Sequence, residues 1–510
     1  MGYLLSKFLN RNALLVYDGN KPWLNYTYLT RMIVDGYRWL TYHSFQGTNQ
    51  RYGLKRGFLP IDNLSLLKPI LMKLMMIKLR FSVKLLVAFL LLGSLSRCQL
   101  ADHGLPKPAE ERADIVYQWY KFMNRLQMPV TPQPVLLAQH RAFGYIGVGL
   151  YESVQPGIKD ASSLSKKLYQ MPDMPQIEGS KDYLWSASAN AALASMFKLF
   201  LGSLTTVNQA SIDSMEAANY NRLRLTTSEE VLQRSQAFGR SVATAIYNWS
   251  TTDNFTLAST GYTPLNEAWA WVPTPPNFAA AVGANLQHSR PMLAYSLTAT
   301  APLLPFPYSE DPSSNFYKEA KKVYDIGVTL TAEQKAIANW WADAGGTGTG
   351  VPAPYHILSI VTSVLETQQA SLGRAAAVYA KTGIGLKDGP INTFRAKFQY
   401  NLLRPVTYIR RHIDANWLSY LINPQYPEYP SGLVSNYGPV IQVLIREFGD
   451  IPVTDDAYAW RGLPARQFNS LSALLTEAAV SRVYAGIHYQ FTQDISIEMG
   501  KALGDEIYKL

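Results

Sequence analysis

The chain has 510 residues, of which 47% are hydrophobic and 16% are charged, so it can bury a large core and lacks the composition of a long disordered protein. Its net charge of +10 suggests a nucleic-acid partner, but residues 1–98 carry 14 Lys or Arg against 3 Asp or Glu, whereas the remainder has 33 basic and 34 acidic residues. The excess positive charge belongs to the N-terminal segment, and we therefore expect no nucleic-acid partner.

Residues 72–98 have the pattern of a secretory signal peptide. Four basic residues between Met72 and Lys84 precede the apolar run Leu85–Leu92, and small residues follow it. The run is shorter than the roughly 20 residues that a membrane-spanning helix needs, and a buried helix is the alternative. We therefore expect a bacterial protein that is exported to the periplasm or the outer membrane, whose mature chain begins near residue 98 or 99 and has no transmembrane span.

Two further features of the N-terminal region bear on this prediction. A signal peptide normally starts the chain, so residues 1–71 are expected to be an untranslated or unstructured upstream extension. The only cysteine, Cys98, follows the apolar run and resembles the lipidated residue of a bacterial lipoprotein signal, although Arg97 stands where such signals usually have a small residue. Cys98 is thus a candidate lipid anchor, and a single cysteine excludes an internal disulfide.

Beyond residue 100 the pattern is helical. The tetrads 227–230 and 331–334 resemble capping boxes, in which a hydroxyl and an acid or amide satisfy free amides at a helix start. They predict helices over 231–249 and 332–343, and a third predicted helix covers about 357–382. Strand-like alternation is scarce. We therefore expect an all-α fold in which residues 99–510 form one large multi-helix domain.

Lys397 and Arg404 form the first pattern that suggests an anion site. Seven residues advance a helix by two turns, so we expect both side chains on one helix face, about 10 Å apart along the axis. Pro405 disfavours helical geometry at Arg404 and places it near the helix end. An arginine fork and a lysine point charge suit an anion with several oxygens, although such a pair is also common on solvated faces.

The segment Pro427–Leu433, with the sequence PEYPSGL, is expected to be a loop that leads into a helix. Ser431 is the candidate cap of that helix, and the backbone N–H groups beside Gly432 are expected to point at a bound anion. Pro439 is expected to kink the helix or delay its start. An ordinary helix cap without a ligand is the alternative.

The third pattern is Ser481-Arg482 followed by His488. Ser481 and His488 are two turns apart on one helix face, with Arg482 on a neighbouring face, unless Gly486 breaks the helix and turns His488 towards Arg482. A lone histidine is more often structural than catalytic, but a histidine at this distance from Ser-Arg in a chain with 7 His is a candidate catalytic residue.

The order and spacing of these segments resemble the vanadium-dependent haloperoxidase and type-2 phosphatidic acid phosphatase superfamily. Its pattern is a Lys and an Arg-Pro pair separated by six residues, later Pro-Ser-Gly-His, and later Ser-Arg and a His separated by five residues; this chain has both spacings. The upstream segments 138–143, 151–152 and 336–343 look like the bacterial exported haloperoxidase-like branch. The resemblance implies the all-α helical bundle of that superfamily.

The resemblance also implies roles for the matching residues. Three cations would neutralise a tetrahedral oxyanion: Lys397, Arg404 and Arg482. Ser431 and the Gly432 amide would donate hydrogen bonds to it, and His488 would bond vanadium in a peroxidase or attack phosphorus in a phosphatase. We therefore expect these six residues to converge on one cavity.

Two positions depart from the superfamily pattern. Leu433 stands in place of the His of Pro-Ser-Gly-His, which is the general acid or the partner of bound peroxide, and leucine cannot transfer a proton. Thr492 stands four residues after His488, where the superfamily usually has the Asp that orients the imidazole. His356 and Asp494 are secondary candidates for the proton donor and the orienting carboxylate.

Three functions stay open at this point. A haloperoxidase would oxidise halide with peroxide at bound vanadate, an exported phosphomonoesterase would act through a phosphohistidine, and Leu433 and Thr492 suit a catalytically impaired oxyanion-binding relative. Chain length favours the haloperoxidase, because lipid phosphatases of the superfamily are usually short and multiply membrane-spanning. Vanadate is the expected cofactor, phosphate suits the same pocket, and the expected substrates are small molecules. The oligomeric state is open.

Overall fold

The computed structural model describes residues 105–127, 136–201, 205–293, 304–343, 351–459 and 462–510. It also describes two short antiparallel strands near the N-terminus, β1 (Tyr17–Asp18) and β2 (Lys21–Pro22). The predicted signal peptide, its upstream extension apart from these strands, and Cys98 lie outside the described residues. Residues His103–Leu510 form one compact unit, to which the following description applies.

The first part of this unit is a layer of packed helices. Their bounds are α4 (Asp114–Gln127), α5 (Leu136–Val154), α6 (Trp185–Phe200), α7 (Thr206–Leu223) and α8 (Glu229–Ser250), with short 3₁₀ turns η1 (Gln155–Gly157), η2 (Leu164–Lys166) and η3 (Ala284–His288). The alanine-rich α6 is buried along most of its length and packs between α5 and α8. Small side chains allow this close approach of neighbouring helices.

The second part carries the three predicted motifs. Its helices are α10 (Asn315–Val328), α11 (Ala332–Trp340), α12 (Ala353–Thr367), α13 (Leu372–Tyr400), α14 (Pro405–His412), α15 (Gly432–Phe448), α16 (Leu471–Tyr484) and α17 (Gln490–Tyr508). A two-stranded antiparallel sheet, β3 (Val453–Asp455) and β4 (Arg466–Phe468), lies beside α12 and α16.

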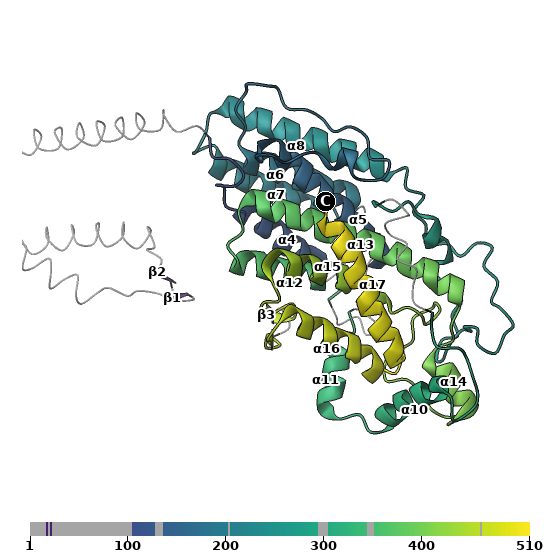
Figure 1. Ribbon diagram of the computed structural model, residues 1–510. Coiled ribbons are helices and arrows are strands. Elements are labelled where there is room, and N and C mark those ends of the chain that lie inside the picture. Colours follow the sequence, from purple (N-terminus) through teal and green to yellow (C-terminus); the bar gives the residue numbers. More distant parts are fainter. Residues whose placement is uncertain are drawn as a thin grey trace, which may run out of the picture. The chain divides into compact units, whose positions relative to one another are not determined.

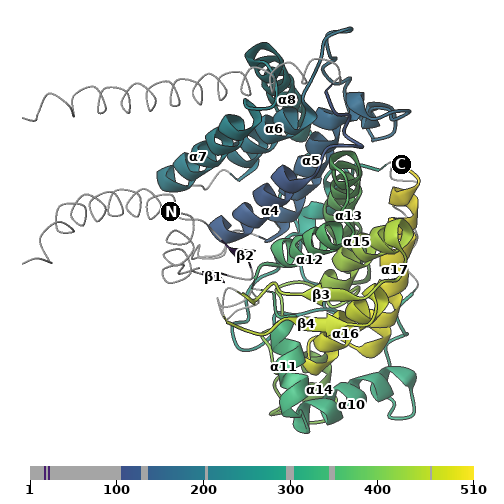
Figure 2. The ribbon, with the colours of Figure 1, turned by 90° about the vertical axis from the view of Figure 1, so that its left-hand side faces the viewer.

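The long helix α13 joins the two parts, because it packs against α5 on one side and against α15 and α17 on the other. Figures 1 and 2 show these helices side by side at the centre of the unit, with α10, α11 and α14 together at one end. At Gly147 of α5 an added Cβ would lie 2.3 Å from the carbonyl oxygen of Tyr379. A side chain there would therefore force α5 and α13 apart.

The predicted all-α fold is confirmed, and the helix predictions hold with local corrections. Thr331 and Gln334 form the expected capping box of α11. In the other tetrad Ser228 is the cap, because its hydroxyl accepts from the N–H of Val231. The single helix predicted over 357–382 is wrong: α12 ends at Thr367 and α13 begins after Ser371, which caps it. Periodicity continues across this break because both helices bury apolar residues there.

Among the described residues, no helix is both long and apolar enough to cross a membrane.

Candidate oxyanion site

Lys397 and Arg404 reach the same place from two different helices. α13 ends at Tyr400, and Asn401 follows in the left-handed region with φ 52°. Arg404 precedes the first residue of α14 in an extended conformation, with φ −73° and ψ 152°. The predicted common helix face is therefore wrong, because Asn401 ends one helix and Pro405 begins the next. Both side chains instead contact the loop 426–430.

The ammonium group of Lys397 holds this loop in place. Its Nζ donates to the carbonyl oxygens of Pro427 and Glu428 at 2.9 Å each and to that of Pro430 at 2.5 Å. The side chain is fully buried, and burial together with the charge of Arg404 lowers the pKa of Lys397 well below its usual value. Because all three N–H groups donate to the loop, Lys397 contributes its positive charge to the site and holds the loop in place.

The guanidinium group of Arg404 links that loop to the segment that carries His488. Its Nε and Nη2 donate to the carbonyl oxygen of Tyr426 at 3.2 and 3.0 Å. Its Nη1 donates to the carbonyl oxygen of Ile487 at 2.9 Å and lies 3.3 Å from Nε2 of His488. Burial is the main reason why the pKa of Arg404 falls to about 10, so the group is still cationic at neutral pH.

His488 lies in the turn between α16 and α17. Gly486, with φ 74°, breaks the helix after Tyr484, as the second of the two sequence-based alternatives required. Burial, followed by the charges of Arg404, Lys397 and Arg482, lowers the pKa of His488 well below its usual value. The imidazole is therefore neutral.

The carboxylate that orients His488 is Glu428, which the sequence argument did not single out. Its Oε1 lies 2.7 Å from Nδ1 of His488 and accepts the N–H of Tyr489 at 3.1 Å, while Oε2 accepts the hydroxyl of Thr492 at 2.9 Å. Because Glu428 occupies Nδ1 as an acceptor, the ring proton is assigned to Nδ1 and the lone pair to Nε2. The contact is a hydrogen bond from a neutral ring to a carboxylate.

The position of Glu428 explains the substitution at position 492. Asp494, the predicted substitute, accepts from Nε2 of Gln490 at 2.9 Å. The orienting carboxylate comes from the loop before α15, and Thr492 supports it with a hydroxyl. Burial raises the pKa of Glu428 to about 7, although Arg404 and Lys397 act in the opposite direction. The only local signal for this role was an acidic residue between two prolines.

Ser431 and Arg482 present buried polar atoms without a partner among the described residues. Ser431 precedes α15, but its hydroxyl makes no capping bond, and its N–H donates to Oγ of Ser496. Arg482 donates from Nη1 to the carbonyl oxygen of Trp341 at 2.9 Å. The atoms left over are Ser431 Oγ and Arg482 Nε. Buried donors without partners are rare in proteins, so both atoms fit a bound acceptor.

Charge and helix geometry make the same place suitable for an anion. The charge of Arg482 lowers the pKa of both Arg404 and His488, so these groups act on one another electrostatically. α15 begins at Gly432, and its N-terminus favours negative charge. Apart from its chain neighbours and the backbone of its own helix, the nearest described atom to a Cβ added at Gly432 is the hydroxyl oxygen of Tyr426, at 3.8 Å. The residue set therefore fits a tetrahedral oxyanion.

Comparisons with known proteins agree with this arrangement. The family model described as the VCPO second helical-bundle domain matches residues 377–510, which include every residue of the candidate site. The crystal structure of a bacterial vanadium-dependent iodoperoxidase is 26% identical, has a TM-score of 0.69, and covers 80% of this chain and 98% of its own. The family model over residues 377–510 and this structure both support the resemblance to the vanadium haloperoxidase superfamily.

Two structures of lower sequence identity show the same fold. Structures of the apo and holo forms of a bacterial vanadium-dependent chloroperoxidase are each 16% identical, with TM-scores of 0.57 and 0.54. The alignments cover 80% and 76% of this chain and 98% and 95% of theirs. A search of curated proteins finds no match.

Leu433, which replaces a histidine of the superfamily pattern, is half-buried and packs against the main hydrophobic core.

The secondary candidate His356 is fully buried elsewhere in the core, with Nδ1 2.7 Å from Asp343 and Nε2 2.9 Å from Asp455. Burial alone lowers the pKa of His356, but the two carboxylates outweigh it and raise the pKa to about 10. Both ring N–H groups are thus already donated to carboxylates.

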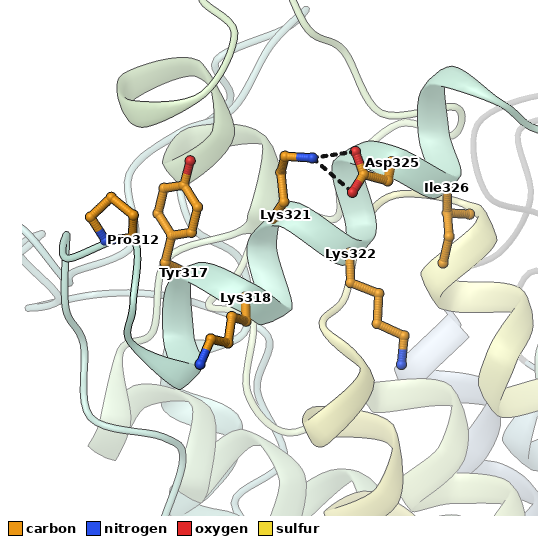
Figure 3. Close-up of a pocket in the computed structure, with 7 residues that line it drawn as sticks. All are labelled: Pro312, Tyr317, Lys318, Lys321, Lys322, Asp325 and Ile326. Carbon is orange, nitrogen blue, oxygen red and sulfur yellow. Dashed lines mark hydrogen bonds and ion pairs between the residues drawn. The ribbon is translucent and has the colours of Figure 1, made fainter.

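A surface hollow on α10 offers a contrast to the buried site. It is lined by Pro312, Tyr317, Lys318, Lys321, Lys322, Asp325 and Ile326. Figure 3 shows Lys321 paired with Asp325, whereas the amines of Lys318 and Lys322 point in different directions. The lysines do not converge on one point, so we assign no anion site to this hollow.

Proposed function

We propose that this protein is a vanadium-dependent haloperoxidase-like enzyme that binds vanadate and oxidises halide with hydrogen peroxide. The observation that carries the proposal is the neutral His488, whose Nε2 lies 3.3 Å from Nη1 of Arg404 while Glu428 holds Nδ1. The lone pair on Nε2 suits the electrophilic central atom of a tetrahedral anion, and the neighbouring guanidinium suits its negatively charged oxygens. The 26% identical iodoperoxidase supports the same proposal.

The residues divide the work of binding between charge and hydrogen bonds. Arg404 and Arg482 would neutralise the anion. Lys397, which donates its hydrogen bonds to the loop 426–430, would add its positive charge without contacting the anion. Ser431 Oγ and Arg482 Nε would donate to its oxygens, because each lacks a partner among the described residues. His488 Nε2 would hold the central atom. Bound vanadate would supply the Lewis acidity that activates peroxide.

Orientation of His488 is the task of Glu428. A carboxylate on the far nitrogen fixes both the tautomer and the plane of the ring, as is common for metal-bound histidine. Thr492 and the N–H of Tyr489 hold the two oxygens of that carboxylate. The direction in which Nε2 points is therefore set before any ligand arrives.

The test is an assay of the purified full chain with and without orthovanadate, in the presence of hydrogen peroxide and iodide or bromide. We expect halide oxidation that depends on vanadate and that phosphate suppresses by competition. His488→Ala serves as the inactive variant. Vanadate binding without any halide oxidation would contradict the proposed activity and favour a catalytically impaired anion-binding relative.

Phosphomonoester hydrolysis is a second candidate function. The same neutral Nε2, oriented by Glu428, suits nucleophilic attack on phosphorus, in which an N–P bond forms and the ester oxygen leaves. Leu433 offers no proton to that oxygen. We therefore expect any hydrolysis to favour esters with acidic leaving groups and to be inhibited by vanadate. Vanadate-inhibited hydrolysis without halide oxidation would replace the first proposal.

We also propose that the protein is exported and matures near residue 98 or 99. The basic and apolar stretch of residues 72–96 supports this. Mass spectrometry of the N-terminus of exported protein should find no residue from 1–71. An intact segment 1–71 in the exported protein would contradict the proposal.

A further inference from the structure

We infer that Tyr426 is a further binding residue of the oxyanion site, and that its phenolic hydroxyl donates to the bound anion in the place where Leu433 has no donor. The inference rests on the proposed oxyanion-binding function. It concerns a residue outside the three motifs that first indicated the site. The placement of its ring and the position of its hydroxyl carry the argument.

The ring of Tyr426 covers the two cations that come from α13 and α14. Nζ of Lys397 lies 4.9 Å from the ring centroid, and Cζ of Arg404 lies 5.4 Å from it. The ring of Phe394 packs against it at 5.1 Å between centroids with an interplanar angle of 62°. The backbone carbonyl of the same residue accepts from Arg404. The ring is therefore fixed by contacts on several sides.

The hydroxyl of Tyr426 lies over the start of α15. Apart from the chain neighbours of Gly432 and the backbone of its own helix, it is the nearest described atom to a Cβ built on Gly432, at 3.8 Å. The hydrogen bonds between described residues include none from this hydroxyl. Tyr426 is half-buried, whereas the residues 427–431 that follow it are buried. The hydroxyl thus stands at the mouth of the site, beside the helix N-terminus.

The ring of Tyr426 lies close to the part of the site where Arg404 meets His488. Its centroid is 5.4 Å from Cζ of Arg404, whose Nη1 lies 3.3 Å from Nε2 of His488. An anion that contacts Arg404 and His488 would therefore have the phenol nearby. A phenolic O–H donates a short hydrogen bond to an anionic oxygen, which an aliphatic side chain such as Leu433 cannot do.

The first experiment measures orthovanadate binding to the full chain by isothermal titration calorimetry. Tyr426→Phe keeps the ring over the cations and removes only the hydroxyl, and Tyr324→Phe on α10 is the matched control. We expect Tyr426→Phe to weaken binding roughly tenfold, the loss typical of one hydrogen bond to a charged group. The control should bind as the wild type does. Equal affinities of wild type and Tyr426→Phe would overturn the inference.

Two further measurements distinguish a hydrogen bond from a structural effect. The thermal unfolding temperature should be the same for wild type and Tyr426→Phe, and the ⁵¹V NMR shift at saturation should differ between them. An unchanged shift at saturation would overturn the inference. Failure of the wild type itself to bind orthovanadate would overturn the proposed function and this inference together.

A double variant tests whether the hydroxyl takes the place of the missing imidazole. Leu433→His introduced into Tyr426→Phe should restore most of the lost affinity, because it provides another donor beside Gly432. Absence of any recovery, in a double variant that unfolds at the wild-type temperature, would overturn the inference.

Discussion

His488 and His356 are two buried histidines with opposite charge states. Their exposed fractions are 2% and 0%, and each contacts at least one carboxylate. The pKa of His488 lies well below its usual value, whereas that of His356 is raised to about 10. Burial lowers both pKa values, so burial does not explain the difference.

The surrounding charges explain it. Three cations act on His488, which shares Glu428 with the N–H of Tyr489 and with Thr492. His356 lies between Asp343 and Asp455, whose charges stabilise the imidazolium. A neutral ring with a lone pair on Nε2 is able to bond an electrophilic centre, whereas a charged ring held by two carboxylates is not. The comparison shows how the same side-chain type takes opposite charge states in two buried regions, of which only the neutral one suits the proposed binding role.

Removal of His488 should have the largest effect on function. His488→Ala removes the lone pair, so we expect vanadate-dependent activity to fall by at least about three orders of magnitude. The protein should still fold, with a free energy of unfolding within about 2 kcal/mol of the wild type. Halide oxidation rates and urea unfolding measure the two quantities. Wild-type activity in this variant would remove His488 from the site.

Asp455→Asn should instead reduce stability. The substitution leaves the charged ring of His356 with one carboxylate in a fully buried position, and breaking a buried pair costs about 3–5 kcal/mol. Urea unfolding at pH 7 measures the loss. Asp494→Asn removes a carboxylate from an exposed position and should change the free energy of unfolding by less than about 0.5 kcal/mol. Equal losses in the two variants would show that the His356 pairing contributes nothing.

The pH dependence of unfolding sharpens the same contrast. The pKa of His356 is raised to about 10 in the folded protein from the ordinary histidine value of about 6.5. The folded state therefore binds the extra proton, and this contribution is complete below about pH 6.5 and lost as the pH rises towards 10. We expect the free energy of unfolding to fall between pH 7 and pH 9.5 in the wild type, and to fall less in Asp455→Asn. A flat wild-type profile would contradict the charged state of His356.

Glu428→Gln should have an intermediate effect on binding. The amide is able to keep one acceptor for Nδ1 of His488, but the charge is lost, and changes of this kind typically cost 10–100-fold in affinity or activity. Orthovanadate titration measures the loss, with Glu498→Gln on the exposed side of α17 as the control. An affinity equal to that of the control would mean that His488 is oriented without this carboxylate.

Leu433→His should act in the opposite direction from the other substitutions, as a gain in turnover. A positioned general acid usually accelerates a reaction 10²–10⁴-fold. We therefore expect the turnover of phosphomonoesters with unactivated leaving groups to rise by at least about tenfold. Vanadate affinity should change far less, because the cations and His488 are untouched. Equal turnover in both proteins, with the anion bound in both, would show that another group already supplies the proton.

Local sequence patterns determined the elements and the chemistry of the site. The hydroxyls of Thr331 and Ser228 cap α11 and α8, because capping depends on residues within one turn. The spacing of Lys, Arg-Pro, Ser-Gly and Ser-Arg with His identified the superfamily. Of the two alternatives for residues 481–488, a continuous helix or a break at Gly486, the break is correct, since a positive φ favours glycine.

Only the tertiary structure decided how these groups meet. Asn401 separates Lys397 from Arg404, although seven residues fit two turns of one helix equally well. Glu428 reaches His488 across 60 positions of the chain, and Asp455 reaches His356 across 99. Periodicity and capping report only on neighbours within one or two turns. The charge of a buried histidine depends on groups brought together by helix packing, so the sequence alone did not predict that His488 is neutral and that His356 is charged.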